Sequence, residues 1–468
     1  MVRPGRVIKP RSIGVSSLRT GPFYTVVSVE LGNTTTKCIL VTTNLRTAEI
    51  YEIDKEVRFT RDVRPPSEGE EVFGSTIFGV ELTEQSVSEM VAEVLTTVLS
   101  RSRLDVERDL HFAVRSTGVT AGFASPSEVG AIVKALADGC LRAGMPPRKM
   151  TASLSPENLP PGLRDFTWLK KVYFDGAVTS TLPPSDAGIV ANEMEGELVT
   201  AGIKGAVKGT TIDFRNPVMT LDFGTTLAGR VTDMGHPYAR TIGSFVGLAG
   251  AIPDAIVRGS GLIDSSQGNV LDLPRMSRKR STVSEDWLEE ARNLVRVSYV
   301  GAGDARFGTV PVNPKAAREG DVVLIGVDAG MNGSSLGSLQ QLGERLVKSE
   351  GLDALVPLVD WIQVDIVQQI VALAEQSGII LPETSLGLTG RAITTGRKPA
   401  LIADTLRLQS GVKWTDSHIL VVVEDGLAMG AAVAARCMNS MGTPSNPMGG
   451  RRGDRCIMGA RMKIQKKG

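Results

Sequence analysis

The alternation of apolar and polar positions predicts a strand followed by a turn at two places that carry nearly the same sequence. Residues 26–34 read Val-Val-Ser-Val-Glu-Leu-Gly-Asn-Thr, and residues 218–226 read Val-Met-Thr-Leu-Asp-Phe-Gly-Thr-Thr. In both, an apolar, β-branched run leads to a carboxylate, one apolar residue, a glycine and polar residues. Such a turn gathers N–H groups and hydroxyls, which hold phosphate oxygens, beside a carboxylate, which holds hydrated Mg²⁺. Two such turns facing each other would clamp a nucleotide phosphate tail.

Helical periodicity appears after the first strand region. Apolar residues recur at helical spacing from Val87 to Leu99 and form one continuous stripe. A second helix is predicted from Ser125, an N-cap serine followed by proline at N1 and glutamate at N3, and Gly144 ends it. An apolar strand, residues 111–120, lies between these helices. After residue 216 the organisation restarts with the second strand and turn, which predicts an α/β fold with two domains.

The predicted division of the chain has four parts. Residues 1–22 are basic and lack periodicity, so we expect a flexible arm, and residues 23–210 form the first domain. The stretch 145–215 is rich in proline and loops, which places the boundary near its end and assigns residues 211–440 to the second domain. Residues 441–468 are a Gly/Pro-rich and then basic tail. A chain of 468 residues is too long for one ordinary core.

Composition and charge argue against several classes of protein. The formal net charge of +1 gives no case for nucleic-acid binding, and the basic tail lacks the interleaved aromatics of a nucleic-acid site. The four cysteines are scattered with no C-x-x-C pair, which argues against disulfides, zinc and iron–sulfur sites and fits a cytoplasmic protein. The longest apolar stretches, near 358–374 and 419–435, are interrupted by acidic residues, so no membrane span is expected.

The repeated unit of strand, acid-x-Gly turn, strand and helices resembles the two-domain sugar kinase, Hsp70 and actin superfamily, in which two related α/β domains close over ATP. Val29–Lys37 corresponds to that superfamily's first phosphate motif and Leu221–Thr226 to its second. Leu386–Arg391 is the best candidate for its adenosine motif, and the small-residue-rich run 426–432 matches its final connecting helix. The order and spacing of all four motifs fit.

This resemblance implies two actin/Hsp70-like domains closing over ATP and Mg²⁺. Asp222 and Glu30 would hold Mg²⁺ through water and are the candidate catalytic residues. Lys37 and the turn amides would hold the phosphates. The cofactor-binding residues carried over to this sequence, the last two bordering adenosine, are Gly32, Asn33, Thr34, Thr35, Lys37, Gly224, Thr225, Thr226, Gly387 and Gly390.

Two departures from the superfamily pattern favour nucleotide binding over hydrolysis, so at most a slow ATPase is expected. Glu30 stands where the superfamily has aspartate, and one extra methylene moves the carboxylate by roughly an ångström at a site whose metal geometry is strict. The run Phe223-Gly224-Thr225 stands where nucleotide hydrolases often have a glycine-rich run.

A closer resemblance covers the chain from about Tyr24 to its end. Residues 29–38, 220–226, 326–333 and 451–467 look like the methanogenesis marker protein 14 family, an uncharacterised archaeal family restricted to methane-metabolising organisms. This implies a role tied to methyl-coenzyme M reductase or another methanogenic enzyme. The fold also resembles the ATP-dependent reactivating factors of corrinoid and cobalamin enzymes, but without a cysteine cluster this chain could not deliver electrons itself.

Three functional hypotheses follow. The first is an ATP-binding accessory protein that uses domain closure to remodel, activate or assemble a methanogenic enzyme. That enzyme or its assembly factors is then the expected partner, and a homodimer is also compatible with the sequence. The second is a small-molecule kinase, which needs a carboxylate base, and Asp328 is the one candidate. The third is a non-enzymatic scaffold with a decayed nucleotide site, which Glu30 favours.

One acidic cluster remains outside these motifs. Glu193, Glu195 and Glu197 alternate with Met194 and Gly196. They could face a metal ion or a partner, but we interpret them as a solvated polar face.

Overall fold

The computed structural model describes most of both predicted domains. The described residues are 5–119, 126–150, 153–154, 174–175, 177–179, 190–235, 239–274 and 282–439. The predicted basic tail, residues 441–468, lies outside them.

The first domain is built on a six-stranded sheet with the order β11-β8-β3-β4-β5-β2. Its centre is the antiparallel meander of β3, β4 and β5, and β8 and β11 continue it in parallel with β3. The strands are β2 (Arg11–Ser12), β3 (Phe23–Leu31), β4 (Thr35–Asn44), β5 (Ile50–Phe59), β8 (Phe112–Thr117) and β11 (Ala177–Thr179).

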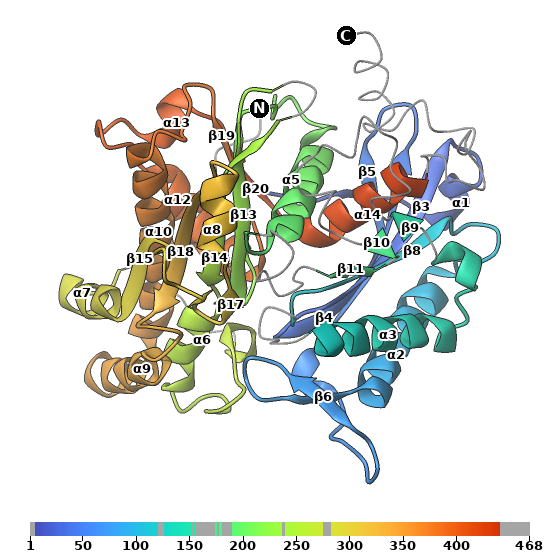
Figure 1. The fold of residues 1–468 in the computed structure, drawn as a ribbon, viewed down its shortest axis with the longest axis horizontal. Coiled ribbons are helices and arrows are strands. Elements are labelled where there is room, and N and C mark those ends of the chain that lie inside the picture. The colour runs from blue at the N-terminus through green and yellow to red at the C-terminus, as the bar shows by residue number, and fades with distance from the viewer. Residues whose placement is uncertain are drawn as a thin grey trace.

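Two helices cover one face of the first sheet, α2 (Glu84–Ser102) and α3 (Pro126–Arg142) (Figure 1). Helix α2 starts at a capping box, in which Thr83 accepts the N–H of Ser86 and the Ser86 hydroxyl accepts the N–H of Thr83. The apolar stripe predicted from Val87 to Leu99 is buried against the sheet and α3. Both helices therefore form where the sequence predicted them, because amphipathic periodicity is a local property of the chain.

The second domain is built on an eight-stranded sheet with the order β1-β20-β19-β12-β13-β14-β18-β15. Helices pack on its outer face and enclose an aliphatic core (Figure 1). The strands are β1 (Val7–Ile8), β12 (Val218–Phe223), β13 (Thr226–Thr232), β14 (Thr241–Leu248), β15 (Val295–Tyr299), β18 (Val323–Ala329), β19 (Ser385–Thr389) and β20 (Leu420–Val423). The helices of this domain are α6 (Ala251–Arg258), α7 (Glu285–Leu294), α8 (Pro314–Glu319), α9 (Leu336–Glu350), α10 (Leu355–Gln376), α11 (Arg391–Thr394), α12 (Lys398–Thr405) and α13 (Trp414–Ser417). Of these, α8 packs on the other face of the sheet, in a cluster with Val246 and Leu324.

The two sheets share one topology. The run β20-β19-β12-β13-β14 repeats the run β11-β8-β3-β4-β5, with the same antiparallel meander and the same two parallel strands beside it. The duplication seen in the sequence is thus a duplication of whole domains, and the predicted two-domain α/β fold is confirmed.

Two helices lie side by side between the domains, α5 (Glu193–Val207) and α14 (Gly426–Asn439) (Figure 1). Helix α5 follows the first sheet in sequence but packs on β12, β13 and β19 of the second, whereas α14 follows the second sheet and packs on β3 and β8 of the first. Glycines allow the two backbones to meet. A Cβ on Gly430 would lie 1.7 Å from the carbonyl oxygen of Leu198, and one on Gly202 would lie 1.8 Å from that of Gly426.

The predicted flexible arm contributes to both sheets where it is described. Strand β1 pairs in parallel with β20 of the second sheet, and β2, only a few residues later, pairs in parallel with β5 of the first. Lys9, between these strands, forms an ion pair of 3.0 Å with Glu424. A short helix, α1 (Val15–Leu18), follows and buries Leu18. Sequence periodicity could not reveal strands of two residues, because their stability comes from the sheet edges they join.

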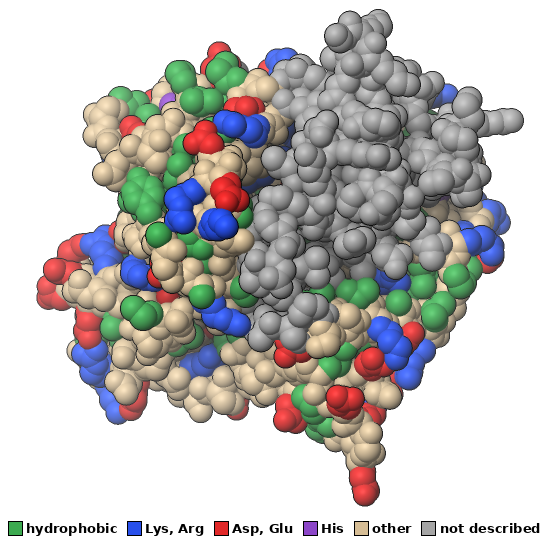
Figure 2. All heavy atoms as spheres, viewed as in Figure 1, with side chains coloured by type: hydrophobic (Ala, Val, Ile, Leu, Met, Phe, Trp, Pro, Cys, Tyr) green, Lys and Arg blue, Asp and Glu red, His purple; other side chains and the backbone are tan. Residues whose placement is uncertain are grey.

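Smaller elements complete the described chain. A hairpin of β6 and β7 extends the first domain, and a narrow projection with acidic side chains at its tip lies next to β6 (Figures 1 and 2). On the face shown in Figure 2, basic and acidic side chains of the second domain are interspersed rather than gathered by sign. These elements are β6 (Val72–Ser75), β7 (Glu81–Thr83), β9 (Ser153–Leu154), β10 (Phe174–Asp175), β16 (Arg306–Phe307), β17 (Val310–Pro311), η1 (Thr60–Asp62), η3 (Pro147–Lys149), η6 (Val270–Asp272) and η7 (Leu352–Ala354).

One stretch in the described part of the chain, Leu352–Gln376, is long and apolar enough to cross a membrane by length and composition. It comprises η7 and α10 and is longer than the apolar run 358–374 seen in the sequence. In the structure 72% of its apolar window is buried inside the protein. Ile362, Ile366 and Ile370 are fully buried in the second domain's core, as expected for the central helix of a globular domain.

The helix crossing generates a stability prediction. Gly430→Ala places a methyl group against the Leu198 carbonyl, and we expect a loss of about 2–3 kcal/mol because the backbones must separate. Gly337→Ala, in helix α9, is the matched control, because its Cβ would have no atom within 4 Å. Thermal or urea unfolding of both variants measures the difference. Equal stability of the two variants would show that α5 and α14 are not held in close contact.

Candidate functional site

The two acid-x-Gly turns lie at one cleft between the domains. Glu30 is the penultimate residue of β3, and Asp222 is the penultimate residue of β12. Each carboxylate pairs in register with a hydroxyl residue of the adjacent parallel strand, Ser116 in β8 and Thr389 in β19. We call residues 32–34 the first turn and residues 224–225 the second turn. Both turns line a cavity of about 240 Å³.

The structure brings nearly all of the predicted site residues to this cavity. Lining it are Glu30, Gly32, Asn33, Thr34, Thr35, Lys37, Asp222, Gly224, Thr225, Thr226 and Gly390.

Gly387 is the predicted site residue that does not reach the cleft. It lies within β19, and a Cβ there would approach the Phe214 ring to 2.8 Å and Ile203 to 2.9 Å. Its small size therefore allows β19 to pack against its neighbours, including α5, rather than allowing approach to a ligand. Gly390 differs, because its φ is +95° and a Cβ would lie 2.4 Å from the Asp222 carboxylate. It permits the turn after β19 to lie directly against the end of β12, at Asp222 and Phe223.

Acidic side chains gather in the cleft, which is lined by Glu30, Glu195, Asp222, Glu424 and Asp425. Burial, followed by the nearby Glu30 and Glu195, raises the pKa of Asp222 to about 8, although Lys37 acts to lower it. Burial likewise raises the pKa of Glu30. Accumulated buried acids that disfavour each other's ionisation are typical of a site that takes a cation or moves a proton.

Glu195 belongs to this cleft, so the interpretation of its cluster as a solvated face was wrong for this residue. It lies on α5, is 6% exposed, and accepts a hydrogen bond of 3.2 Å from Asn192. Glu197, half-buried, pairs instead with Arg230. The missed signal is helical: Leu198 and Val199 follow Glu195 at i+3 and i+4, which places an acid on the apolar stripe of the helix.

Lys37 is held by an acid that the sequence analysis did not identify. Its ammonium lies 2.6 Å from Asp425, which also binds Lys55 at 2.8 Å. Burial lowers the pKa of Lys37, but Asp425 and Glu30 outweigh it and leave the pKa above its usual value. Burial raises the pKa of Asp425, and the two lysines outweigh that and lower it to about 2. Asp425 immediately precedes the small-residue run of α14, which was its one sequence signal.

The first and second turns touch through their threonines. The hydroxyls of Thr34 and Thr225 lie 2.8 Å apart, so a hydrogen bond joins the two domains at the point where the turns meet. The Arg391 guanidinium donates to Thr34 at 2.9 Å and to Thr225 at 3.4 Å. Arg391 forms an ion pair with the fully buried Asp254 of α6. Neither Arg391 nor Asp254 was predicted as a site residue.

Asn33 has a structural function in the first turn. Its side chain donates to the carbonyl of Gly118 at 3.2 Å and accepts the N–H of Ile77 at 2.9 Å. The turn is thereby fixed to the end of β8 and to the β6–β7 hairpin. Its side-chain amide is used within the protein rather than offered to a ligand.

The residues present fit Mg²⁺ and phosphate. Mg²⁺ is usually bound by one or two carboxylates, with water and substrate phosphates completing the octahedron. Asp222 and Glu30 supply that number, and the described residues contain no group of three His, Cys, Asp or Glu placed as a ready coordination shell. The Arg391 guanidinium and the threonine hydroxyls are suited to phosphate oxygens. The cavity is smaller than the roughly 300–1,000 Å³ of typical ligand pockets, so a nucleotide would have to separate the turns in order to bind there.

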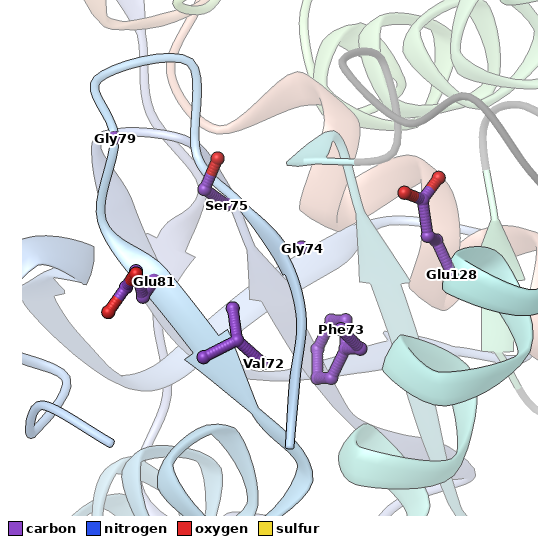
Figure 3. Close-up of a pocket in the computed structure, with 7 residues that line it drawn as sticks. All are labelled: Val72, Phe73, Gly74, Ser75, Gly79, Glu81 and Glu128. Atoms are coloured by element: carbon purple, nitrogen blue, oxygen red, sulfur yellow. The ribbon is translucent and has the colours of Figure 1, made fainter.

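Two other features lack the properties of a site. A larger concavity of about 460 Å³ lies beside the β6–β7 hairpin, but Ser75, Glu81 and Glu128 do not point toward one another there (Figure 3). Asp328, the candidate kinase base, does not line the cleft between the domains. Its fully buried carboxylate accepts N–H groups of Ala329, Asn332 and Gly333, which stabilise the loop after β18.

The buried acids generate a pH prediction for Asp222→Asn. In the folded state the pKa of Asp222 is raised from 3.8 to about 8, so the contribution of Asp222 to wild-type stability decreases as pH rises between about 4 and 8. Asparagine does not ionise, and its stability advantage should grow over that range by at most about 1.4 kcal/mol per pH unit. Glu30, Glu195, Lys37 and Asp425 are the charged groups that face residue 222, and they are unchanged in the variant.

The measurement is the unfolding temperature of both proteins at pH 5 and pH 8 without Mg²⁺ or nucleotide. Asp321→Asn is the control, because its side chain is 87% exposed and its substitution should give no pH-dependent difference. A constant difference between Asp222→Asn and wild type at both pH values would contradict the raised pKa.

The solved structures that are similar to this chain match it with low TM-scores. The ethanolamine utilization protein EutJ from Carboxydothermus hydrogenoformans is 11% identical with a TM-score of 0.34 and covers 91% of this chain and 92% of its own. An inorganic polyphosphate/ATP-glucomannokinase from Arthrobacter is 11% identical with a TM-score of 0.36 and covers 88% and 98%. A reductive activator for corrinoid, iron-sulfur protein is 11% identical with a TM-score of 0.36 and covers 89% and 60%. Because these scores are low, the strand order of the two sheets remains the basis for the fold.

Sequence relatives are much closer. An uncharacterized protein of Methanocaldococcus jannaschii is 50% identical over 459 residues, covering 98% of this chain and 94% of the relative. An uncharacterized protein of Methanothermobacter thermautotrophicus is 51% identical over 456 residues, covering 96% of this chain and 84% of the relative. A family model described as "Uncharacterized protein conserved in archaea (DUF2114)" matches residues 23–465. The chain therefore belongs to this archaeal family, whose similar members include proteins of methanogens.

Proposed function

We propose that this protein binds Mg²⁺-ATP in the cleft between its two domains and uses domain closure to remodel, activate or assemble a methanogenic enzyme. The observation that carries the proposal is the meeting of the two duplicated turns, joined by the Thr34–Thr225 hydrogen bond beside buried carboxylates. Hydroxyls, a guanidinium and carboxylates converge there from both domains, which is the chemistry that a metal-bound phosphate tail requires.

Each group has a role in this proposal. Asp222 and Glu30 hold the hydrated Mg²⁺, which when bound neutralises phosphate charge. Gly32 and Gly224 keep side chains out of the turns, so that phosphate can approach the backbone. Lys37, fixed by Asp425, keeps positive charge at the base of the cleft. Gly390 brings the turn after β19 against the end of β12, beside the Asp222 carboxylate.

Contacts between residues of the two domains hold the cleft closed. Besides the Thr34–Thr225 bond, Arg61 of the first domain binds both carboxylate oxygens of Asp272 in the second at 2.6 Å. Lys55 of β5 binds Asp425 at the start of α14. A ligand that separates the turns disturbs these contacts, so the relative position of the domains depends on whether the cleft is occupied. A partner that contacts both domains would bind the occupied and the empty protein differently.

Glu195 supports slow turnover of the bound nucleotide. It is a buried carboxylate on α5 that lines the cleft beside Asp222, and it raises the pKa of Asp222, after burial and Glu30. A carboxylate in that place can orient a water molecule toward a phosphate and accept its proton. Burial also raises the pKa of Glu30 in the same cleft.

A methanogenic partner is proposed from the membership of the family. The two similar relatives come from Methanocaldococcus jannaschii and Methanothermobacter thermautotrophicus, and their identities of 50% and 51% extend over nearly the whole chain. The target would be an enzyme such as methyl-coenzyme M reductase or its assembly factors. The small-molecule kinase hypothesis has lost its named base, because Asp328 is buried and bonded outside the cleft.

Nucleotide binding is tested by thermal shift. We expect saturating Mg²⁺-ATP to raise the unfolding temperature of the wild type by a few °C, because a ligand that binds only the folded state stabilises it. Gly224→Ala should fold normally, because its Cβ meets Thr226 at an ordinary 3.4 Å, but its methyl group should abolish most of the shift. Gly337→Ala should shift like wild type. Absence of any wild-type shift would contradict the proposal and favour the scaffold hypothesis.

The partner is tested by affinity capture from a methanogen extract with and without ATP. We expect a methanogenic enzyme to be retained in a nucleotide-dependent way by the wild type, and Asp222→Ala to lose that dependence. Mass spectrometry identifies the retained subunits. Retention that is the same with ATP, without ATP and with Asp222→Ala would contradict a role for nucleotide-driven closure.

A further inference from the structure

Arg391 occupies the point where the two turns meet. It is the first residue of α11, directly after Gly390, and its side chain is 13% exposed. One terminal nitrogen, Nη2, lies 2.9 Å from the Thr34 hydroxyl and 3.4 Å from the Thr225 hydroxyl. A single guanidinium therefore contacts both turns and both domains.

The position of this guanidinium is fixed from the second domain. Asp254 accepts bonds from both terminal nitrogens of Arg391 and is fully buried. The same carboxylate accepts the N–H of Val270 at 3.0 Å, at the start of the turn whose Asp272 binds Arg61. Asp254 thus supports two contacts that reach the first domain. The Nε of Arg391 is buried without a hydrogen-bond partner among the described residues, so the pair with Asp254 leaves donor capacity unused.

The two lysines of the cleft already form ion pairs with an acid of the protein. Among the described residues that line it, the basic side chains are Lys37, Lys55 and Arg391, and both lysines bind Asp425. Arg391 alone of these three reaches the threonines of the turns. Its contacts there are neutral hydroxyls, which are weaker acceptors than a phosphate dianion. A phosphate entering between the turns would offer the guanidinium a stronger bond than the two hydroxyls do.

We propose that Arg391 is the phosphate-reading residue of the cleft, which selects nucleoside triphosphates over diphosphates by binding the terminal phosphate between the two turns. This inference rests on the proposed function. The terminal phosphate replaces the direct Thr34–Thr225 bond, and Arg391 then bridges both turns through the ligand. Loss of that phosphate returns the guanidinium to the hydroxyls. Because Asp254 also supports the turn that carries Asp272, the phosphate state is coupled to the contact with Arg61.

The test is calorimetric titration of the full-length protein with Mg²⁺-ATP, Mg²⁺-ADP and adenosine. Arg391→Ala should weaken ATP binding about 10- to 100-fold, as expected for a charge-assisted bond. ADP binding should weaken by less than about threefold, and adenosine binding should not change. Arg391→Lys keeps the positive charge but lacks the planar guanidinium that can donate two parallel hydrogen bonds, so it should weaken ATP binding by an intermediate factor. Arg292→Ala is the matched control, because Arg292 binds Asp365 at 2.9 Å and does not line the cleft.

Each outcome decides the inference. If wild type binds ATP and Arg391→Ala binds it equally well, or loses ATP and ADP affinity to the same extent, Arg391 does not read the terminal phosphate. If wild type binds none of the three ligands, the proposed function fails and the inference fails with it. If Arg391→Ala does not fold because Asp254 is left unpaired, Arg391→Lys decides, and an ATP affinity equal to wild type overturns the inference.

Discussion

The close crossing of α5 and α14 is the constraint on which the rest of the structure depends. Each helix follows one sheet in sequence and packs on the other, so the two domains share an apolar cluster drawn from both sheets. Glycines make this possible, because any Cβ on Gly202 or Gly430 would enter the backbone of the facing helix. Glu195 lies in the first turn of α5, and Asp425 lies immediately before the first residue of α14. The crossing thereby fixes the depth of the cleft and the acids within it.

The two copies of the acid-x-Gly turn share a topology but differ in electrostatic environment. In the first copy, Glu30 pairs in register with Lys37 of β4, whereas in the second copy Asp222 pairs with Ala228 of β13. A cation thus stands directly opposite one carboxylate and an apolar methyl group opposite the other. Burial and the nearby acids raise the pKa of Asp222, and Lys37 acts to lower it. Domain duplication preserved the geometry of the strand ends while their charges diverged.

The groups in the cleft bond to one another, and a ligand could replace these bonds with bonds to itself. Threonine hydroxyls bond to each other, a guanidinium bonds to them, and burial and nearby acids raise the pKa of Asp222. The hydroxyls and the guanidinium would form stronger hydrogen bonds to a metal-bound phosphate than they form to each other, because charged partners give stronger hydrogen bonds than neutral ones. At the turns the cleft is therefore closed by hydrogen bonds to neutral hydroxyls, which are weaker than those a phosphate would form. Such contacts favour closure without preventing the separation that entry of a ligand requires.

The sequence by itself determined the local elements and the two turns. Strand ends at Glu30 and Asp222 and the stripe of α2 depend on residues close together in the chain, and the structure has them where the pattern indicated. Tertiary structure decided which distant residues share the cleft. Arg391, Glu195 and Asp425 join it, and Gly387 leaves it, because those placements depend on how helices and turns from both domains pack. Periodicity describes one element at a time, whereas a charge on one domain meets its partner on the other only after folding.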